Sequence, residues 1–205
     1  MTEFVYVINR ASLEKMPNLY SRPFSRVGMD LVGLTVALLE GFFMARQDAE
    51  EHPEYKQVIP YTIFTAEDDQ RLVYQRAGSE ARLVGQYSIG VGGHINSVDA
   101  LDCDWKQDMV LNNMRRELGE ELELQGITVE SLLDKAGLKG VLYTADNPVN
   151  RVHLGIVHEV YVPVDDKPRF SMKSEGKNLG WKSPAELLDL GDELESWSRI
   201  ILEAD

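Results

Sequence analysis

A run of acidic residues on a predicted helix is the feature that most constrains this chain. Residues 116–121 read Arg116, Glu117, Leu118, Gly119, Glu120 and Glu121. Helical spacing places the three glutamates at positions i, i+3 and i+4, along one side of the helix. Like charges at that spacing repel one another and weaken an isolated helix, so a bound divalent cation is the simplest compensation. Clustered carboxylate oxygens are hard ligands that suit Mg²⁺ or Mn²⁺.

The helix that carries this acidic segment (residues 116–121) is predicted over 108–124. Its apolar residues recur at spacings of three and four, which is the period of a half-buried helix. They are Leu111, Met114, Leu118 and Leu122. The glutamates lie beside this stripe, so the helix can bury one flank while it presents carboxylates from the next.

Strands and helices alternate along the rest of the chain. Apolar runs bounded by turn residues predict seven strands and three further helices. The strands are expected at 4–8, 57–65, 71–75, 81–90, 140–144, 152–162 and 179–181, and the other helices at 31–48, 129–136 and 193–203. A turn is expected at Asp68 and Asp69. Another helix begins at Ser183, a capping residue, with Pro184 at the first helical position.

Composition narrows the class of protein and of partner. The chain has 205 residues and a net charge of −13, which argues against duplex nucleic acid as a partner. A bound metal ion inverts the local charge, so a small phosphorylated substrate is compatible with the negative net charge of the chain. The one cysteine, Cys103, indicates a reducing, cytoplasmic setting. No apolar stretch is long enough to span a bilayer, and the N-terminus has no signal-peptide pattern.

A double glycine precedes the acidic helix. Ser88, Ile89, Gly90, Val91, Gly92, Gly93 and His94 form a strand that runs into this turn. The succession of strand, glycine turn, loop and acidic helix suggests metal-assisted chemistry on a phosphorylated compound.

These motifs resemble the Nudix family. Arg116, Glu117, Leu118, Glu120, Glu121 and Leu124 match the core of the family's box, and the resemblance extends over about 57–201. It also covers the strand before the double glycine and a late segment that runs from Glu175 through Trp181 to Leu187. The resemblance implies an α/β/α sandwich around a mixed curved sheet. It assigns 56–205 to this domain and leaves 1–55 as an N-terminal extension on the same domain, which is a candidate for a homodimer contact.

The chain departs from the family pattern at three points. Glu123 replaces the glycine that follows the paired glutamates, and Asp108 replaces the first glutamate of the box. We expect Asp108 to cap the helix or to pair with Arg116. The spacing from Gly93 to Arg116 is longer than in the family, so a loop is inserted within 95–106. The metal cluster survives these changes, whereas the substrate pocket is expected to differ.

The resemblance also implies roles for individual residues. Glu117, Glu120 and Glu121 are metal ligands, and Arg116 orients the helix by pairing with a carboxylate. Glu175, in the loop before Trp181, is a further metal ligand or the general base, and the alternative is an exposed loop glutamate.

Other candidate residues lie around the glycine turn. Gly92 and Gly93 bring backbone close to metal or phosphate, and the alternative is an ordinary strand-end turn. His94 is a candidate contact for substrate or metal. His153 and His158, on opposite faces of one strand, are assigned structural roles.

Three functions remain open at this point. The leading one is a hydrolase that uses Mg²⁺ or Mn²⁺ to cleave a phosphoanhydride bond in a nucleoside-diphosphate-linked or similar compound. The second is an isopentenyl-diphosphate-isomerase-like enzyme, because Val91, Gly92, Gly93 and His94 are similar to that group's Val-Cys-Gly-His segment. Gly92 stands where that group has its cysteine. The third is a non-catalytic, ligand-binding or regulatory protein with the same fold.

Overall fold

The computed structural model describes residues 2–16, 22–26, 31–77, 84–101, 103, 106–173 and 180–205. The chain divides into two compact units that are interleaved along the sequence. Unit 1 comprises Met1–Tyr61, Gly92–Arg116 and Leu138–Val157, and unit 2 comprises Thr62–Val91, Glu117–Gly137 and His158–Asp205. The predicted split into an extension over 1–55 and a domain over 56–205 stays a prediction.

The strands of unit 1 bring the N-terminal segment onto a central strand. Strand β1 (Phe4–Asn9) pairs antiparallel with β3 (Phe42–Ala45) and with the start of β4 (Tyr55–Ala66). The sheet continues from β4 to β10 (His153–Val162), β9 (Gly137–Leu142) and β2 (Phe24–Arg26). Strand β7 (Gly90–Gly92) also pairs with β4. The glycine turn therefore leaves from the middle of this sheet.

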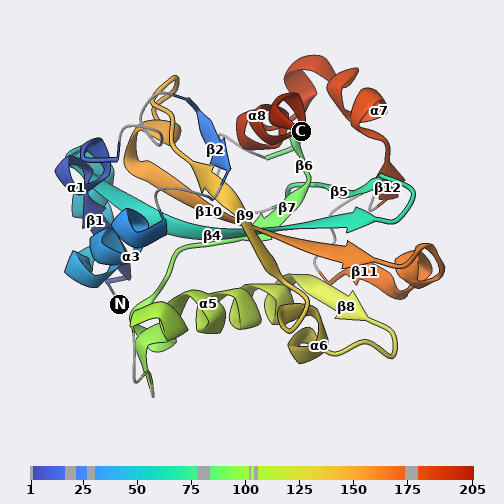
Figure 1. Ribbon diagram of the computed structural model, residues 1–205, viewed down its shortest axis with the longest axis horizontal. Helices are drawn as coiled ribbons and strands as arrows, with labels where there is room; N and C mark the ends of the chain where they lie inside the picture. The colour runs from blue at the N-terminus through green and yellow to red at the C-terminus, as the bar shows by residue number, and fades with distance from the viewer. Residues whose placement is uncertain are drawn as a thin grey trace. The chain divides into compact units, whose positions relative to one another are not determined.

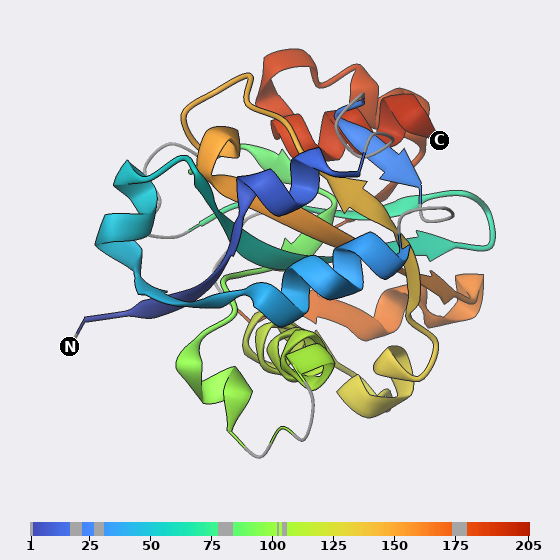
Figure 2. The same cartoon turned by 60° about the vertical axis from the view of Figure 1, so that its left-hand side comes forward.

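Short helices cover β1 within the same unit. Helix α1 (Arg10–Glu14) begins directly after β1, where the side chain of Asn9 accepts a hydrogen bond from the amide of Ala11 at 2.8 Å. Helix α3 (Leu31–Glu40) lies beside α1 and β1 (Figure 2). Helix α4 (Arg46–Glu51) follows β3 and packs its buried Ala49 against Val5 and Val7 of β1. Two 3₁₀ turns, η1 (Ser97–Ala100) and η2 (Asn150–Val152), also belong to this unit.

The predicted single helix over 31–48 is wrong. The segment forms α3, then β3, then α4. Gly41 ends α3 where a side chain could not fit, because a Cβ atom there would lie 2.7 Å from the ring of Tyr6. The aromatic residues that follow Gly41 pair with β1, where Phe43 lies opposite Tyr6. Backbone pairing with β1 therefore overrides the helical pattern of this apolar run.

Unit 2 contains the second half of β4 and the strand that follows it in the chain. Strand β5 (Arg71–Gln75) returns antiparallel to β4 and also pairs with β6 (Tyr87–Ser88) and β12 (Gly180–Lys182) (Figure 1). The predicted turn between β4 and β5 is confirmed, with Asp69 at a φ of 64°. A two-stranded sheet joins β8 (Leu122–Leu124) to β11 (Phe170–Met172). The remaining elements are α6 (Val129–Leu133), η3 (Val164–Arg169), α7 (Pro184–Leu188), η4 (Gly191–Glu193) and α8 (Ser196–Ala204).

The acidic helix, α5 (Lys106–Glu121), is shorter at its C-terminal end than predicted. Residues 122–124 form β8 instead. Leu118 and Leu122 of the predicted stripe are buried, in a core of unit 2 that includes Phe64, Val160 and Phe170. Met114 is also buried, whereas Leu111 is 44% exposed, so the stripe is one position shorter than expected.

The start of α7 is as predicted. Ser183 accepts a hydrogen bond from the amide of Glu186, whose carboxylate in turn accepts one from the amide of Ser183 at 2.9 Å. Within the part of the chain that the structure describes, no helix has the length and apolar character needed to cross a membrane. The cytoplasmic setting stays a prediction.

Candidate functional site

The acidic segment forms the last turns of α5. Glu117 and Glu121 are half-buried and Glu120 is exposed. The end of the helix is held by Lys173, whose backbone amide donates to the carbonyl of Glu121 at 2.8 Å. The ammonium group of Lys173 also donates to the carbonyl of Gly119. The helix thus presents its carboxylates from a fixed C-terminal turn.

Arg116 is held by Asp99, which belongs to the inserted loop. The Nε of Arg116 donates to Oδ1 of Asp99 at 2.9 Å, and a terminal nitrogen donates to Oδ2 at 3.0 Å. Asp99 is buried, and Oδ2 also accepts from the amide of Asn96 at 2.8 Å and from Nδ2 of Asn113 at 3.2 Å. Planar two-point pairing of this kind fixes orientation as well as charge. The pair holds Arg116 of α5 against η1, and the orienting role predicted for Arg116 stays a prediction.

The glycine turn is shaped by close contact with β4. A Cβ atom on Gly92 would lie 2.1 Å from the carbonyl oxygen of Pro60, so any side chain there would collide with backbone. After the turn, the carbonyl of His94 accepts from Nδ2 of Asn113 at 2.8 Å and from Arg116 at 3.0 Å. The close approach of β7 to β4 therefore explains why position 92 is a glycine. The predicted ligand-binding role of Gly92 and Gly93 stays a prediction.

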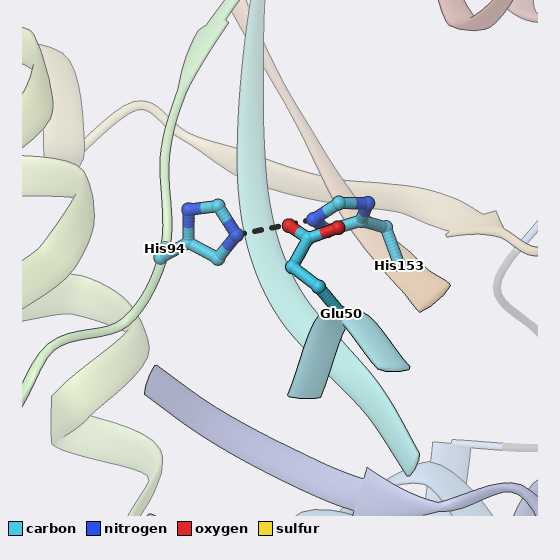
Figure 3. Close-up of side chains that lie close together, drawn as sticks. All are labelled: Glu50, His94 and His153. Atoms are coloured by element: carbon cyan, nitrogen blue, oxygen red, sulfur yellow. Dashed lines mark hydrogen bonds between the residues drawn. The ribbon is translucent and has the colours of Figure 1, made fainter. Parts of the chain in front are cut away.

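Two histidines and a glutamate meet in unit 1. His94 follows the glycine turn, His153 is the first residue of β10, and Glu50 lies on α4. Their side chains point toward one another, and one ligand atom from each lies within 4.8 Å of the other two (Figure 3). The two Nε2 atoms are 3.1 Å apart. Among the described residues, these three form the one such group of possible metal ligands.

The environment keeps His94 neutral. Burial lowers the pKa of His94 well below its ordinary value, and the nearby charges of His153, Arg46 and Arg116 lower it further. A neutral imidazole can accept a hydrogen bond or bind a cation through its unprotonated nitrogen. His94 can therefore act as a ligand at neutral pH.

The roles predicted for Glu175 and Asp108 stay predictions. Glu175 lies outside the described residues. Asp108 lies in the first turn of α5, which begins at Lys106. Cys103 is half-buried in the inserted loop, where its Sγ contacts the carbonyl of Asp99 at 3.1 Å.

The sequence analysis did not single out Asp99 or Glu50, and it assigned His153 a structural role. Asp99 had a usable signal, because asparagine followed three residues later by an acidic residue indicates the start of a helical turn, and in η1 the amide of Asn96 donates to the carboxylate of Asp99. Glu50 and His153 had none. They are far from His94 in the chain, and only the fold brings their side chains together.

The chain is 31% identical to Protein YmaB of Bacillus subtilis (strain 168) over 214 residues, which span 99% of this chain and 97% of that protein. The chain belongs to the YmaB family. No family model matches the chain.

Solved structures show the fold of this YmaB-family chain. The structure of Tm1382, a candidate Nudix hydrolase, superimposes with a TM-score of 0.71 at 24% identity, covering 98% of this chain and 97% of that one. A bifunctional NMN adenylyltransferase/ADP ribose pyrophosphatase from Francisella tularensis, in complex with AMP and a Mn ion, gives a TM-score of 0.55 at 18% identity. It covers 73% of this chain, and the match spans 40% of that protein. These likenesses in fold confirm the predicted α/β fold class, a Nudix-type fold with a mixed sheet flanked by helices.

Proposed function

We propose that this chain is a metal-dependent Nudix-type hydrolase that cleaves a phosphoanhydride bond in a nucleoside-diphosphate-linked or similar diphosphate compound. The observation that carries the proposal is the acidic segment at the end of α5. There Glu117, Glu120 and Glu121 follow Arg116 on consecutive turns, and Arg116 is fixed by Asp99. The likeness in fold to an enzyme named as an ADP ribose pyrophosphatase supports the same class of reaction.

The residues of the acidic segment fit Mg²⁺ or Mn²⁺ by their chemistry. They offer carboxylate oxygens only, which these cations prefer. The three glutamates are not among the groups whose ligand atoms all lie within 4.8 Å of one another in the described residues. Mg²⁺ usually keeps several waters and completes its coordination with substrate phosphates, so the carboxylates need not all contact the ion directly. We therefore assign Glu117, Glu120 and Glu121 as the residues that hold the cation, with Glu175 as a further proposed ligand or base.

A bound divalent cation supplies polarisation of the phosphate oxygens and a lowered pKa for a bound water. The protein residues provide positioning and charge. Asp99 and the carbonyl of His94 hold Arg116, which keeps the start of the acidic segment in place.

The expected substrate is a small phosphorylated molecule. A net charge of −13 disfavours duplex nucleic acid and leaves phosphate recognition to a cation. The Francisella protein was solved with AMP, which supports a nucleotide-containing substrate here. A homodimer formed through the N-terminal segment remains a proposal.

The test is a phosphate-release screen over a panel of diphosphate compounds with Mg²⁺ and with Mn²⁺. We expect activity on at least one compound, and a loss of roughly a hundredfold or more in Glu120→Gln. Glu123→Gln is the matched control, because Glu123 is exposed on β8 and carries the same charge. Equal rates for Glu120→Gln and the parent protein would remove this segment from the mechanism. If calorimetry also detected no Mn²⁺ binding, a non-catalytic role would replace this proposal.

A further inference from the structure

We propose that Glu50, His94 and His153 bind one divalent transition-metal ion of the Zn²⁺ type. This site is distinct from the carboxylates of the acidic segment, and the three ligands belong to unit 1. They come from α4, from the loop after β7 and from the start of β10 (Figure 3). The proposal does not depend on the hydrolase function.

The distance between the two histidines matches that of two ligands on one ion. Their Nε2 atoms lie 3.1 Å apart. Two nitrogens bound to Zn²⁺ at about 2.0–2.1 Å in a tetrahedral arrangement are separated by about 3.4 Å. A ring movement of a few tenths of an ångström would therefore admit the ion. In the metal-free protein the same two nitrogens share a proton, which must move to the other ring nitrogen or leave when the ion binds.

His153 is oriented as a metal ligand usually is. Its Nδ1 lies 2.7 Å from the carbonyl of Val149 and donates to it, so the Nε2 lone pair points toward His94 and Glu50. The turn that supplies this carbonyl is itself fixed. The amide of Asn150 donates to Oδ1 of Asn147 at 2.8 Å, and Nδ2 of Asn150 donates to Oδ1 of Asp146 at 2.8 Å. The imidazole is thus pre-set in one tautomer and one direction.

His94 is fixed through its backbone. The next residue, Ile95, donates its amide to the carbonyl of Val58 and accepts at its own carbonyl from the amide of Tyr6 at 2.9 Å. This places the segment between β4 and β1. Together with the bonds from Asn113 and Arg116 to the His94 carbonyl, these contacts limit the positions that the ring can take.

Glu50 provides the negative charge of the proposed site, and it also faces an open hollow. It lines an open hollow of about 680 Å³ together with Thr2, Glu3, Arg46 and Gln47. The two arginines near His94 have carboxylate partners of their own, since Arg46 lies 3.0 Å from Glu3 and Arg116 lies 2.9 Å from Asp99. Their charges therefore oppose a bound cation less than two unpaired arginines would.

The donor set selects the class of metal. Two imidazoles and one carboxylate are borderline ligands that suit Zn²⁺, Co²⁺ and related ions, whereas Mg²⁺ prefers oxygen alone. Three protein ligands leave a coordination position open, as in zinc sites that bind a water or a small molecule. We assign the site to a single ion with one exchangeable ligand.

The test is a titration of the full-length protein with Co²⁺, followed by its visible absorption, and with Zn²⁺ by calorimetry. We expect one tightly bound ion in the parent protein. Binding should weaken by roughly a hundredfold in Glu50→Gln and in His153→Ala, because each loses a direct ligand. His52→Gln is the matched control, since His52 is an exposed histidine paired with Glu54. Glu120→Gln should bind Co²⁺ like the parent, which separates this site from the acidic segment.

Two results would overturn the proposal. One is the absence of stoichiometric Co²⁺ and Zn²⁺ binding by the parent protein, which would leave the trio as a hydrogen-bonded cluster only. The other is unchanged affinity in Glu50→Gln. His153 is buried, so the His153→Ala result counts only if the circular dichroism and melting temperature of that variant match those of the parent protein. If they do not match, the result for Glu50→Gln, at a half-buried position, decides the test.

Discussion

Arg116 and Asp99 form a two-point ion pair that fastens the acidic helix to the loop before it. Nε and a terminal nitrogen of Arg116 reach the two carboxylate oxygens of Asp99 at 2.9 and 3.0 Å. The side chain of Asp99 is 2% exposed and that of Arg116 is 21% exposed. Since the same carboxylate also satisfies Asn96 and Asn113, it stabilises both the loop and the helix.

Replacing Asp99 by alanine should therefore destabilise the protein by about 3 kcal/mol, because it leaves a largely buried guanidinium without its partner. Urea unfolding of Asp99→Ala and the parent protein measures this. Asp166→Ala is the control, since its ion pair with Arg169 at 3.4 Å is more exposed and should contribute less than about 1 kcal/mol. Equal losses in the two variants would mean that Asp99 acts only as another surface charge.

Replacement of glycine by alanine should have opposite effects on stability at Gly92 and at Gly119. A methyl group on Gly92 would lie 2.1 Å from the Pro60 oxygen, so Gly92→Ala should cost about 3 kcal/mol of stability. On Gly119, in α5, it would meet nothing within 4 Å, and Gly119→Ala should stabilise by up to about 1 kcal/mol. Thermal unfolding of both variants checks the pair. A stable Gly92→Ala protein would show that β7 can move away from β4.

The stability of the protein should rise with pH above neutrality because of Lys56. This lysine is 1% exposed, and it donates to the carbonyl of Arg151 beside the ring of Tyr143. Burial, together with the charges of Arg10 and Arg151, lowers the pKa of Lys56 from 10.5 to about 8. Between pH 8 and 10.5 the unfolded chain therefore binds more protons than the native protein, and the free energy of unfolding increases with pH.

The measurement compares the parent protein with Lys56→Met, which cannot titrate there. The free energy of unfolding of the parent, relative to the variant, should increase by up to about 3 kcal/mol from pH 7 to pH 10.5. Urea unfolding at pH 7, 9 and 10.5 tests this, and other titrating groups cancel in the comparison. Parallel pH profiles would show that Lys56 keeps an ordinary pKa in the native state.

Local patterns in the sequence predicted the elements whose stability is local. The spacing of Met114 and Leu118 located the acidic helix, and Ser183 with Pro184 located the start of α7. The helix predicted over 31–48 failed because an apolar run suits a helix and a strand equally, and the pairing of Phe43 opposite Tyr6 decides between them.

The second candidate site depends on contacts that no local pattern contains. His94 and His153 are 59 positions apart, and their approach follows from the pairing of β7 and β10 with β4. A lone histidine at the start of a strand is an ordinary structural residue by every local criterion. In the acidic segment, by contrast, the three glutamates proposed as ligands lie within two turns of one helix, so helical spacing alone predicted that they share one side.

Removing metal ions and adding them back should distinguish the two proposed cation sites by their different effects on activity and stability. After EDTA treatment, Mg²⁺ should restore phosphate release by the parent protein. Zn²⁺ at about a hundred times its dissociation constant should add about 2.7 kcal/mol of stability, which raises the melting temperature by roughly 5–10 °C. We expect this rise in the parent, in His52→Gln and in Glu120→Gln, but not in Glu50→Gln, because only the last lacks a ligand of the histidine site. A rise abolished by Glu120→Gln as well would instead mean that the acidic segment and the two histidines hold the same ion.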